Sequence, residues 1–139
     1  MKLIPTIFLP GVCTDAIVFY REALGAEVLF EAPVASLVQP EAVKPGTENR
    51  MLRAGLRIGD TVIYLSDGHR QGDPAFEGFC LSIQVESVAE AERFMQALSQ
   101  GGKIQIALRD TAWADTFGMV VDKFGVHWAI EYGTRARLA

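Results

Sequence analysis

Apolar residues recur along this chain with two periods, and the two periods predict strands and helices in a fixed order. Residues 14–25 have the apolar spacing of a helix, with Thr14 as the expected cap and Gly25 as the expected stop. A tight turn is predicted at Gly59-Asp60, and a long polar loop at 33–49. Four segments of the first half are predicted strands: 4–9, 26–32, 51–58 and 61–66. The first half therefore reads βαβββ.

The same order returns in the second half. A capping box, Ser87-Val88-Ala89-Glu90, opens the second predicted helix. Adding 74 to the residue number carries Leu9 onto Ile83, and adding 76 carries Val28 onto Ile104, which is the mark of an internal repeat. Four further segments are predicted strands: 79–85, 103–108, 117–122 and 126–132.

Two βαβββ modules explain this pattern better than a ferredoxin-like βαββαβ sheet does. The ferredoxin-like sheet has too few strands to use both 51–66 and 117–132. We therefore predict an α+β fold, in which one domain, 1–139, contains modules at about 1–67 and 78–133.

Composition narrows the class of partner. The chain has 139 residues, 50% of them hydrophobic, and a formal net charge of -4, which is unsuited to a nucleic-acid backbone or an anionic membrane surface. No segment has the length of a membrane span. The spacing of Cys13 and Cys80 suggests neither a metal site nor an activated thiol, and a reduced, cytoplasmic protein is expected rather than a disulfide. A small molecule or another protein is the expected partner.

Four stretches resemble the vicinal oxygen chelate superfamily, which includes glyoxalase I, extradiol dioxygenases and bleomycin-resistance proteins. They most resemble its PhnB-like branch, and they read AIVFYREALGAEVLF, LRIGDTVIYLSD, ALSQGGKI and DTFGMVVDKFGVHWAI. The resemblance implies that each module curls into a half-open barrel with its helix on the convex side. It also implies a homodimer, which would cover exposed strand edges, and a ligand cavity lined by the concave faces.

The resemblance further implies one divalent metal held by His, Glu or Gln side chains of the first and last strands of each module. Here the first strand offers only Thr6. The glutamate that many relatives carry near the end of the chain would fall at Ala129, and Arg53 stands where the branch often has a histidine. No metal and no cofactor are therefore expected.

His127 and Glu131 are the two remaining donors worth weighing. They point to one face of a predicted strand, but their backbones lie roughly 13 Å apart along it. A divalent metal needs three or more converging donors. We interpret His127 as a pocket or surface histidine, and we interpret both His127 and Glu131 as polar contacts for a ligand. The other histidine, His69, is expected in an exposed loop.

Arg53 is the most informative site residue. Alternation places Arg53, Gly55 and Arg57 opposite a core face formed by Leu52, Ala54, Leu56 and Ile58. A guanidinium beside the space left by Gly55 is suited to a carboxylate or phosphate ligand. The alternative is an arginine that is solvated or paired with an acid such as Glu131 or Asp60.

Aromatic walls complete the hypothesis. Tyr64 and Trp113 would line the ligand cavity, whereas Trp128 is expected in the core. The favoured function is metal-independent binding of a small, anionic molecule. The alternative is a metal-dependent lyase, isomerase or dioxygenase of the same superfamily.

Overall fold

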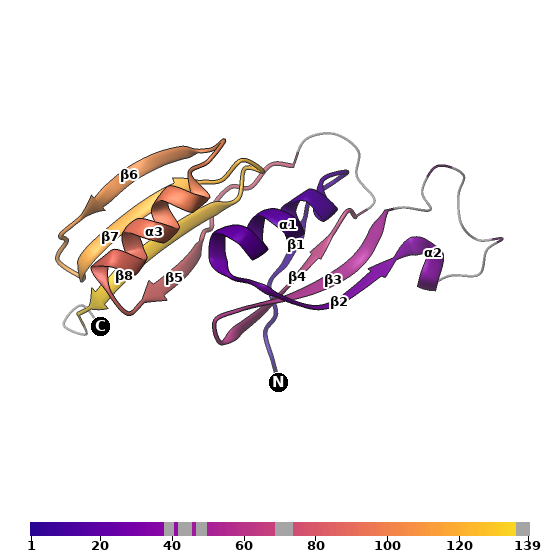
Figure 1. Cartoon of the computed structure of the whole chain (residues 1–139), viewed down its shortest axis with the longest axis horizontal. Helices are drawn as coiled ribbons and strands as arrows, with labels where there is room; N and C mark the ends of the chain where they lie inside the picture. The colour runs from indigo at the N-terminus through magenta and orange to yellow at the C-terminus, as the bar shows by residue number, and fades with distance from the viewer. Residues whose placement is uncertain (38–40, 42–45, 47–49, 69–73, 136–139) are drawn as a thin grey trace. The chain divides into compact units, whose positions relative to one another are not determined.

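The chain forms two compact units, Met1–Pro74 (unit 1) and Ala75–Ala139 (unit 2), in the computed structural model shown in Figure 1. The structure describes residues 1–37, 41, 46, 50–68 and 74–135. Each unit contains one four-stranded sheet with a helix packed on one face, as the βαβββ prediction requires. His69 lies outside the described residues.

Unit 1 is built around a sheet with the strand order β1-β4-β3-β2. β1 runs parallel to β4, and the other two pairs are antiparallel. The predicted turn at Gly59-Asp60 is confirmed, because Ile58 pairs directly with Thr61 across it. The elements are β1 (Thr6–Phe8), α1 (Cys13–Leu24), β2 (Glu27–Pro33), α2 (Val34–Leu37), β3 (Met51–Ile58) and β4 (Thr61–Ser66). The short helix α2 falls at the start of the predicted 33–49 loop.

Helix α1 begins in a different way from the one predicted. Its N-cap is Val12 and no side chain of the helix start caps it, so the expectation for Thr14 is wrong. The buried Asp67, 54 residues away in the sequence, caps the helix instead, since its Oδ1 accepts the Cys13 N–H at 3.2 Å. Its Oδ2 accepts the Met51 N–H at 2.7 Å and thereby ties the helix start to β3.

One predicted core position of β3 is also corrected. Ala54 and Leu56 are fully buried, but Leu52 is exposed and Met51 is buried in its place. Arg53 pairs with Ala32 and Met51 with Pro33, so Leu52 is an extra, bulged residue. A bulge reverses the alternation of side chains from that point, which turns Met51 inward and Leu52 outward.

Unit 2 repeats the plan with the order β5-β8-β7-β6. The Ser87 side chain accepts the Glu90 N–H at 3.0 Å, so the predicted N-cap is confirmed. The elements are β5 (Leu81–Val85), α3 (Val88–Leu98), β6 (Lys103–Arg109), β7 (Ala114–Val121) and β8 (His127–Thr134).

Asp122 organises the connection between β7 and β8. Its Oδ1 accepts the N–H groups of Phe124 and Val126 at 2.9 and 3.1 Å. Its Oδ2 accepts the indole N–H of Trp128 at 2.8 Å. Trp128 is 2% exposed, which confirms its prediction as a core residue.

Both units pair their first strand with their last in the same way. Ile7 of β1 lies beside Leu65 in β4, and Ile83 of β5 lies beside Ile130 in β8, with parallel strands in both cases. The helices α1 and α3 end 74 residues apart, at Leu24 and Leu98, which is the predicted offset.

No helix in the described parts of the chain is long and apolar enough to cross a membrane.

Candidate functional site

The sheet face of unit 1 that α1 leaves uncovered, here called open face 1, carries a guanidinium above an aromatic ring. Arg53 and Gly55 alternate with the buried Ala54 and Leu56, and Tyr64 pairs with Gly55 on the neighbouring strand. The Arg53 Cζ lies 5.1 Å from the centre of the Tyr64 ring, which is a cation–π distance. The two residues predicted for a ligand site on this strand pair are thus in contact.

Phe30 completes this cluster, although it was not predicted to lie here. Its ring meets the Tyr64 ring edge to face, with centroids 5.7 Å apart. Val28 pairs with Leu56 and Phe30 with Gly55, so Leu29 is bulged and turns Phe30 to the open face. The space expected beside Gly55 is therefore filled, since a Cβ there would lie 2.5 Å from the Phe30 ring.

Arg53 and Arg57 differ in whether an acid pairs with them. Among the described residues of unit 1, Arg53 makes no ion pair, and Asp60 does not pair with it. Arg57, four residues further along the same strand, does form one: its Nη1 lies 3.0 Å from Glu27 Oε2. Of these two arginines, Arg53 is the one whose donors are available to an anion.

Open face 2, the face of the second sheet away from α3, has different chemistry. Trp113 packs edge to face on Phe117 with centroids 5.2 Å apart, and Phe117 pairs with Glu131 in the ladder. The amide of Gln84 donates to Glu131 Oε1 at 3.4 Å. His127 stands half-buried at the other end of β8, four residues from Glu131.

These groups do not fit the metal that the fold family implies. The Glu131 side chain accepts a hydrogen bond from Gln84 on the adjacent strand. His127 lies at the start of β8, where its backbone is in register with Val121 of β7. Within the residues that the structure describes, no three His, Cys, Asp or Glu side chains converge as a metal requires. Thr6 and Ala129, the positions at which the resemblance led us to look for ligands, add no donor of the usual kind.

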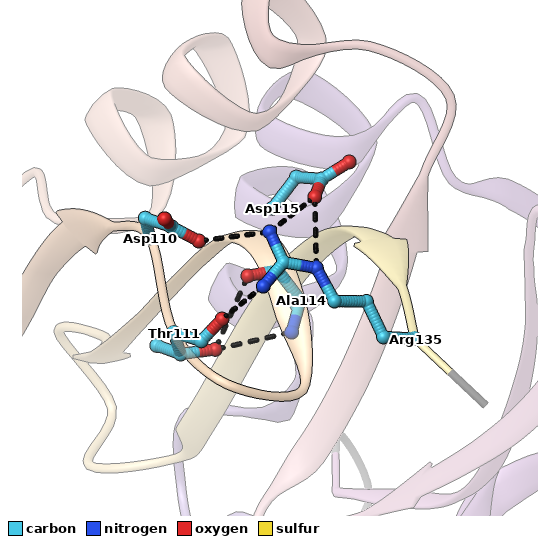
Figure 2. A network of polar contacts seen from close by, with 5 residues as sticks. All are labelled: Asp110, Thr111, Ala114, Asp115 and Arg135. Atoms are coloured by element: carbon cyan, nitrogen blue, oxygen red, sulfur yellow. Dashed lines mark hydrogen bonds and ion pairs between the residues drawn. The ribbon is translucent and has the colours of Figure 1, made fainter. Parts of the chain in front are cut away.

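A network of polar contacts at the end of β8 was missed in the sequence. Arg135 follows the last strand, and its guanidinium reaches the hairpin tip between β6 and β7, where it lies between Asp110 and Asp115 (Figure 2). The predicted strand ended at Tyr132, before Gly133, so nothing in the alternation pointed to Arg135. The signal in the sequence was the acid pair flanking Trp113.

Cys13 has the burial expected of an unreactive thiol. Cys13 is fully buried, and this burial raises its pKa to about 12, with the negative charges of Asp67 and then Glu31 acting in the same direction. Both Cys13 and Cys80 are free in the structure. The Cys13 thiol therefore stays protonated and is not a nucleophile at neutral pH.

Comparison with known proteins agrees with the fold. YjdN of Escherichia coli strain K12 is 34% identical over 140 residues, which cover 94% of each chain. Protein PA1353 of Pseudomonas aeruginosa has a TM-score of 0.83 and 30% identity, covering 97% of this chain and 99% of that one. The PhnB protein of Bacillus cereus shares the fold with a TM-score of 0.79 and 21% identity, over 96% and 100% of the chains.

A family model also matches residues 11–130, which is most of both units. Together with the YjdN similarity, this match confirms the resemblance predicted from the motifs: the chain belongs to the Glyoxalase/Bleomycin resistance protein/Dioxygenase superfamily.

Proposed function

We propose that this member of the superfamily binds a small molecule without a metal, and that Arg53 holds an anionic group of that molecule. The observation that carries the proposal is the guanidinium of Arg53, which is placed over Tyr64 with no acid partner among the described residues of unit 1. An arginine in this state can give a carboxylate or phosphate two parallel hydrogen bonds.

The surroundings of Arg53 favour a ligand with an apolar or planar body. The guanidinium lies over the Tyr64 ring, Phe30 packs edge to face on Tyr64, and 39% of the surface of Phe30 is exposed. Bound apolar groups would cover these rings, and removal of water would strengthen the charge contact. An aromatic carboxylate combines both features.

Open face 2 supports the proposal with a different set of contacts. Trp113 and Phe117 offer an aromatic wall, while His127 and Glu131 offer polar groups. The Glu131 carboxylate would accept hydrogen bonds from a bound donor group and would repel an anionic one. We therefore assign the anionic group to Arg53 on open face 1, and we propose Trp113, His127 and Glu131 as the ligand contacts of open face 2.

A thermal-shift screen tests this proposal with four probes: benzoate, cyclohexanecarboxylate, phenylphosphonate and inorganic phosphate. A ligand at 100 times its dissociation constant adds about 2.7 kcal/mol of stability. Arg53→Ala should weaken binding of the best probe by about 2 kcal/mol, and Arg53→Lys should restore only part of it.

Arg57→Ala is the matched control, because Arg57 lies on the same strand and face but is paired with Glu27. Equal losses from both arginines would show diffuse electrostatics, and no loss from Arg53→Ala would remove the site. Stoichiometric metal in protein purified without chelator, lost on His127→Ala, would instead favour a metal-dependent lyase, isomerase or dioxygenase.

We also propose a cytoplasmic homodimer. Each sheet has outer strands with unpaired backbone groups, which a second copy would cover, and both cysteines are free thiols suited to a reducing compartment. Sedimentation at micromolar concentration should give the mass of two chains, and a pure monomer would contradict the proposal.

A further inference from the structure

We infer that Arg135 is a positioning residue, which fixes the β6–β7 hairpin tip and with it the orientation of the Trp113 side chain on open face 2. The inference rests on the proposed function only in taking Trp113 as a ligand contact. The geometry itself is a property of the free protein.

The contacts of Arg135 enclose the hairpin tip from two sides. Its backbone N–H donates to the carbonyl of Trp113 at 2.7 Å, which holds the tryptophan backbone directly. Its Nη1 donates to the Thr111 carbonyl at 2.9 Å, and its Nη2 donates to Asp110 Oδ1 at 3.0 Å. Its Nε and Nη2 both donate to Asp115 Oδ1, at 3.1 and 2.6 Å (Figure 2).

The tip has its own closed turn, which Arg135 joins to the sheet. The Thr111 N–H donates to the Ala114 carbonyl at 3.0 Å, and the Ala114 N–H donates to Thr111 Oγ1 at 3.1 Å. This turn leaves Trp113 at its outer corner, 40% exposed, with Phe117 as its aromatic neighbour. Without Arg135, the turn would remain closed but would be joined to β8 through fewer bonds.

Only an arginine can make this set of contacts. The three acceptor groups, two carboxylates and a carbonyl, are reached by a planar fork with fixed N–H directions, whereas a lysine ammonium is a single point charge. Gly133 is part of the same device: its φ is +69°, and a Cβ there would collide with the Asp115 carboxylate.

The network serves to position Trp113 rather than to raise the stability of the fold. Its side chains are solvent-exposed, and exposed ion pairs contribute little to the free energy of folding. The hydrogen bond to Asp115 is the largest cause that raises the Arg135 pKa further above its ordinary value, so the guanidinium stays charged at every working pH. A fixed Trp113 would spare a ligand the cost of ordering that side chain on binding.

Fluorine NMR of protein labelled with 5-fluorotryptophan tests the inference without any ligand. The chain has two tryptophans, so two resonances are expected, and Trp113→Phe assigns them. Arg135→Ala should move the Trp113 resonance toward that of a free indole and leave the buried Trp128 resonance in place. The melting temperature should change little.

Arg135→Lys should give an intermediate shift. Gly133→Ala should also move the Trp113 resonance, because its Cβ would displace the Asp115 carboxylate that Arg135 contacts. Arg109→Ala, an exposed arginine at the end of β6, is the control and should move neither resonance. An unmoved Trp113 resonance in Arg135→Ala would overturn the inference, as would full recovery by lysine, which would reduce the role of Arg135 to charge alone.

The thermal-shift screen separates this inference from the proposed function. If all four probes fail to bind the wild-type protein, the proposed function fails, while the Trp113 resonance of Arg135→Ala still decides whether Arg135 positions Trp113. If a probe binds and that resonance is unmoved, the proposed function stands and this inference is overturned.

Discussion

The two units share a fold but differ in the faces that the helices leave open. Both have the same strand order, and both outer antiparallel strands bulge at equivalent points, between Val28 and Phe30 and between Ile104 and Ile106. Open face 1 carries Arg53 over the Tyr64 ring with no acid partner among the described residues of unit 1, whereas open face 2 carries Glu131 with an amide partner. The repeat therefore maintains what packs against the helices, and the open faces are where the units have diverged.

The largest expected effect concerns the two buried acids, one in each unit. Asp122→Ala leaves three donors without their carboxylate, including the buried indole of Trp128, and should lower the free energy of unfolding by about 3 kcal/mol. Asp67→Ala removes two described bonds and should cost less, about 2 kcal/mol. Urea denaturation measures both, and the reverse order would show that the acids are not equivalent supports.

Two matched glycine substitutions test the difference between the faces. Gly118→Ala places a Cβ 2.6 Å from Met95 of α3 and 2.9 Å from the Ile106 carbonyl, and should cost about 2 kcal/mol by overpacking. Gly55→Ala meets only the Phe30 ring, which can rotate toward solvent, so stability should change less. The Phe30–Tyr64 contact should then be lost in near-ultraviolet circular dichroism, and an equal cost at both sites would contradict this assignment of faces.

The cysteines give a third comparison, in alkali. The Cys13 pKa is about 12 in the folded chain against an ordinary value of 9, so the unfolded chain loses this proton first. Its contribution to stability is complete below pH 9 and is lost as the pH rises toward 12, by about 1 kcal/mol at pH 10. Urea titrations at pH 8 and 10 should show this loss in the wild type and not in Cys13→Ala.

The half-buried Cys80 provides the control for that experiment. A thiol reagent at pH 8 should modify one cysteine of the native protein, and Cys80→Ala should abolish the reaction. Fast labelling of Cys13 in the native state would contradict its burial.

The smallest effect is expected at the helix starts. Ser87→Ala removes the side-chain cap of α3 and should cost about 0.5–1 kcal/mol. Thr14→Ala should cost almost nothing, because Asp67 rather than Thr14 accepts an N–H group at the start of α1. Thermal unfolding of the two variants measures the contrast, and an equal loss would restore Thr14 as a cap.

Local signals predicted the elements well because each depends on neighbouring residues. Gly25 ends α1 with a φ of 66°, and Gly59-Asp60 joins two strands in register. The errors came from bulges and from distant contacts. A bulge at Leu52 reversed the expected face, and Asp67 replaced Thr14 from far along the chain.

The candidate site follows the same rule. Arg53 and Tyr64 lie on one face of the sheet because regular alternation and the tight turn at Gly59-Asp60 fix their register. Phe30 was missed because regular alternation would place its side chain on the same face as Val28. The bulge at Leu29 turns Phe30 to the opposite face. Arg135 was missed because its partners lie 20 to 25 residues away, across the sheet from a strand end that Gly133 obscures.

The bulges in β2 and β6 have a consequence for how the protein behaves in a crowded solution. Both strands are outermost in their sheets, and the regular ladder is interrupted at Leu29 in β2, and at Gln105 and again between Ile106 and Arg109 in β6. A strand from another protein cannot form evenly spaced hydrogen bonds along such an edge, because the bulge bends the edge strand and interrupts its row of backbone donors and acceptors. The same irregularity that presents Phe30 on open face 1 thus also protects the chain against edge-to-edge aggregation.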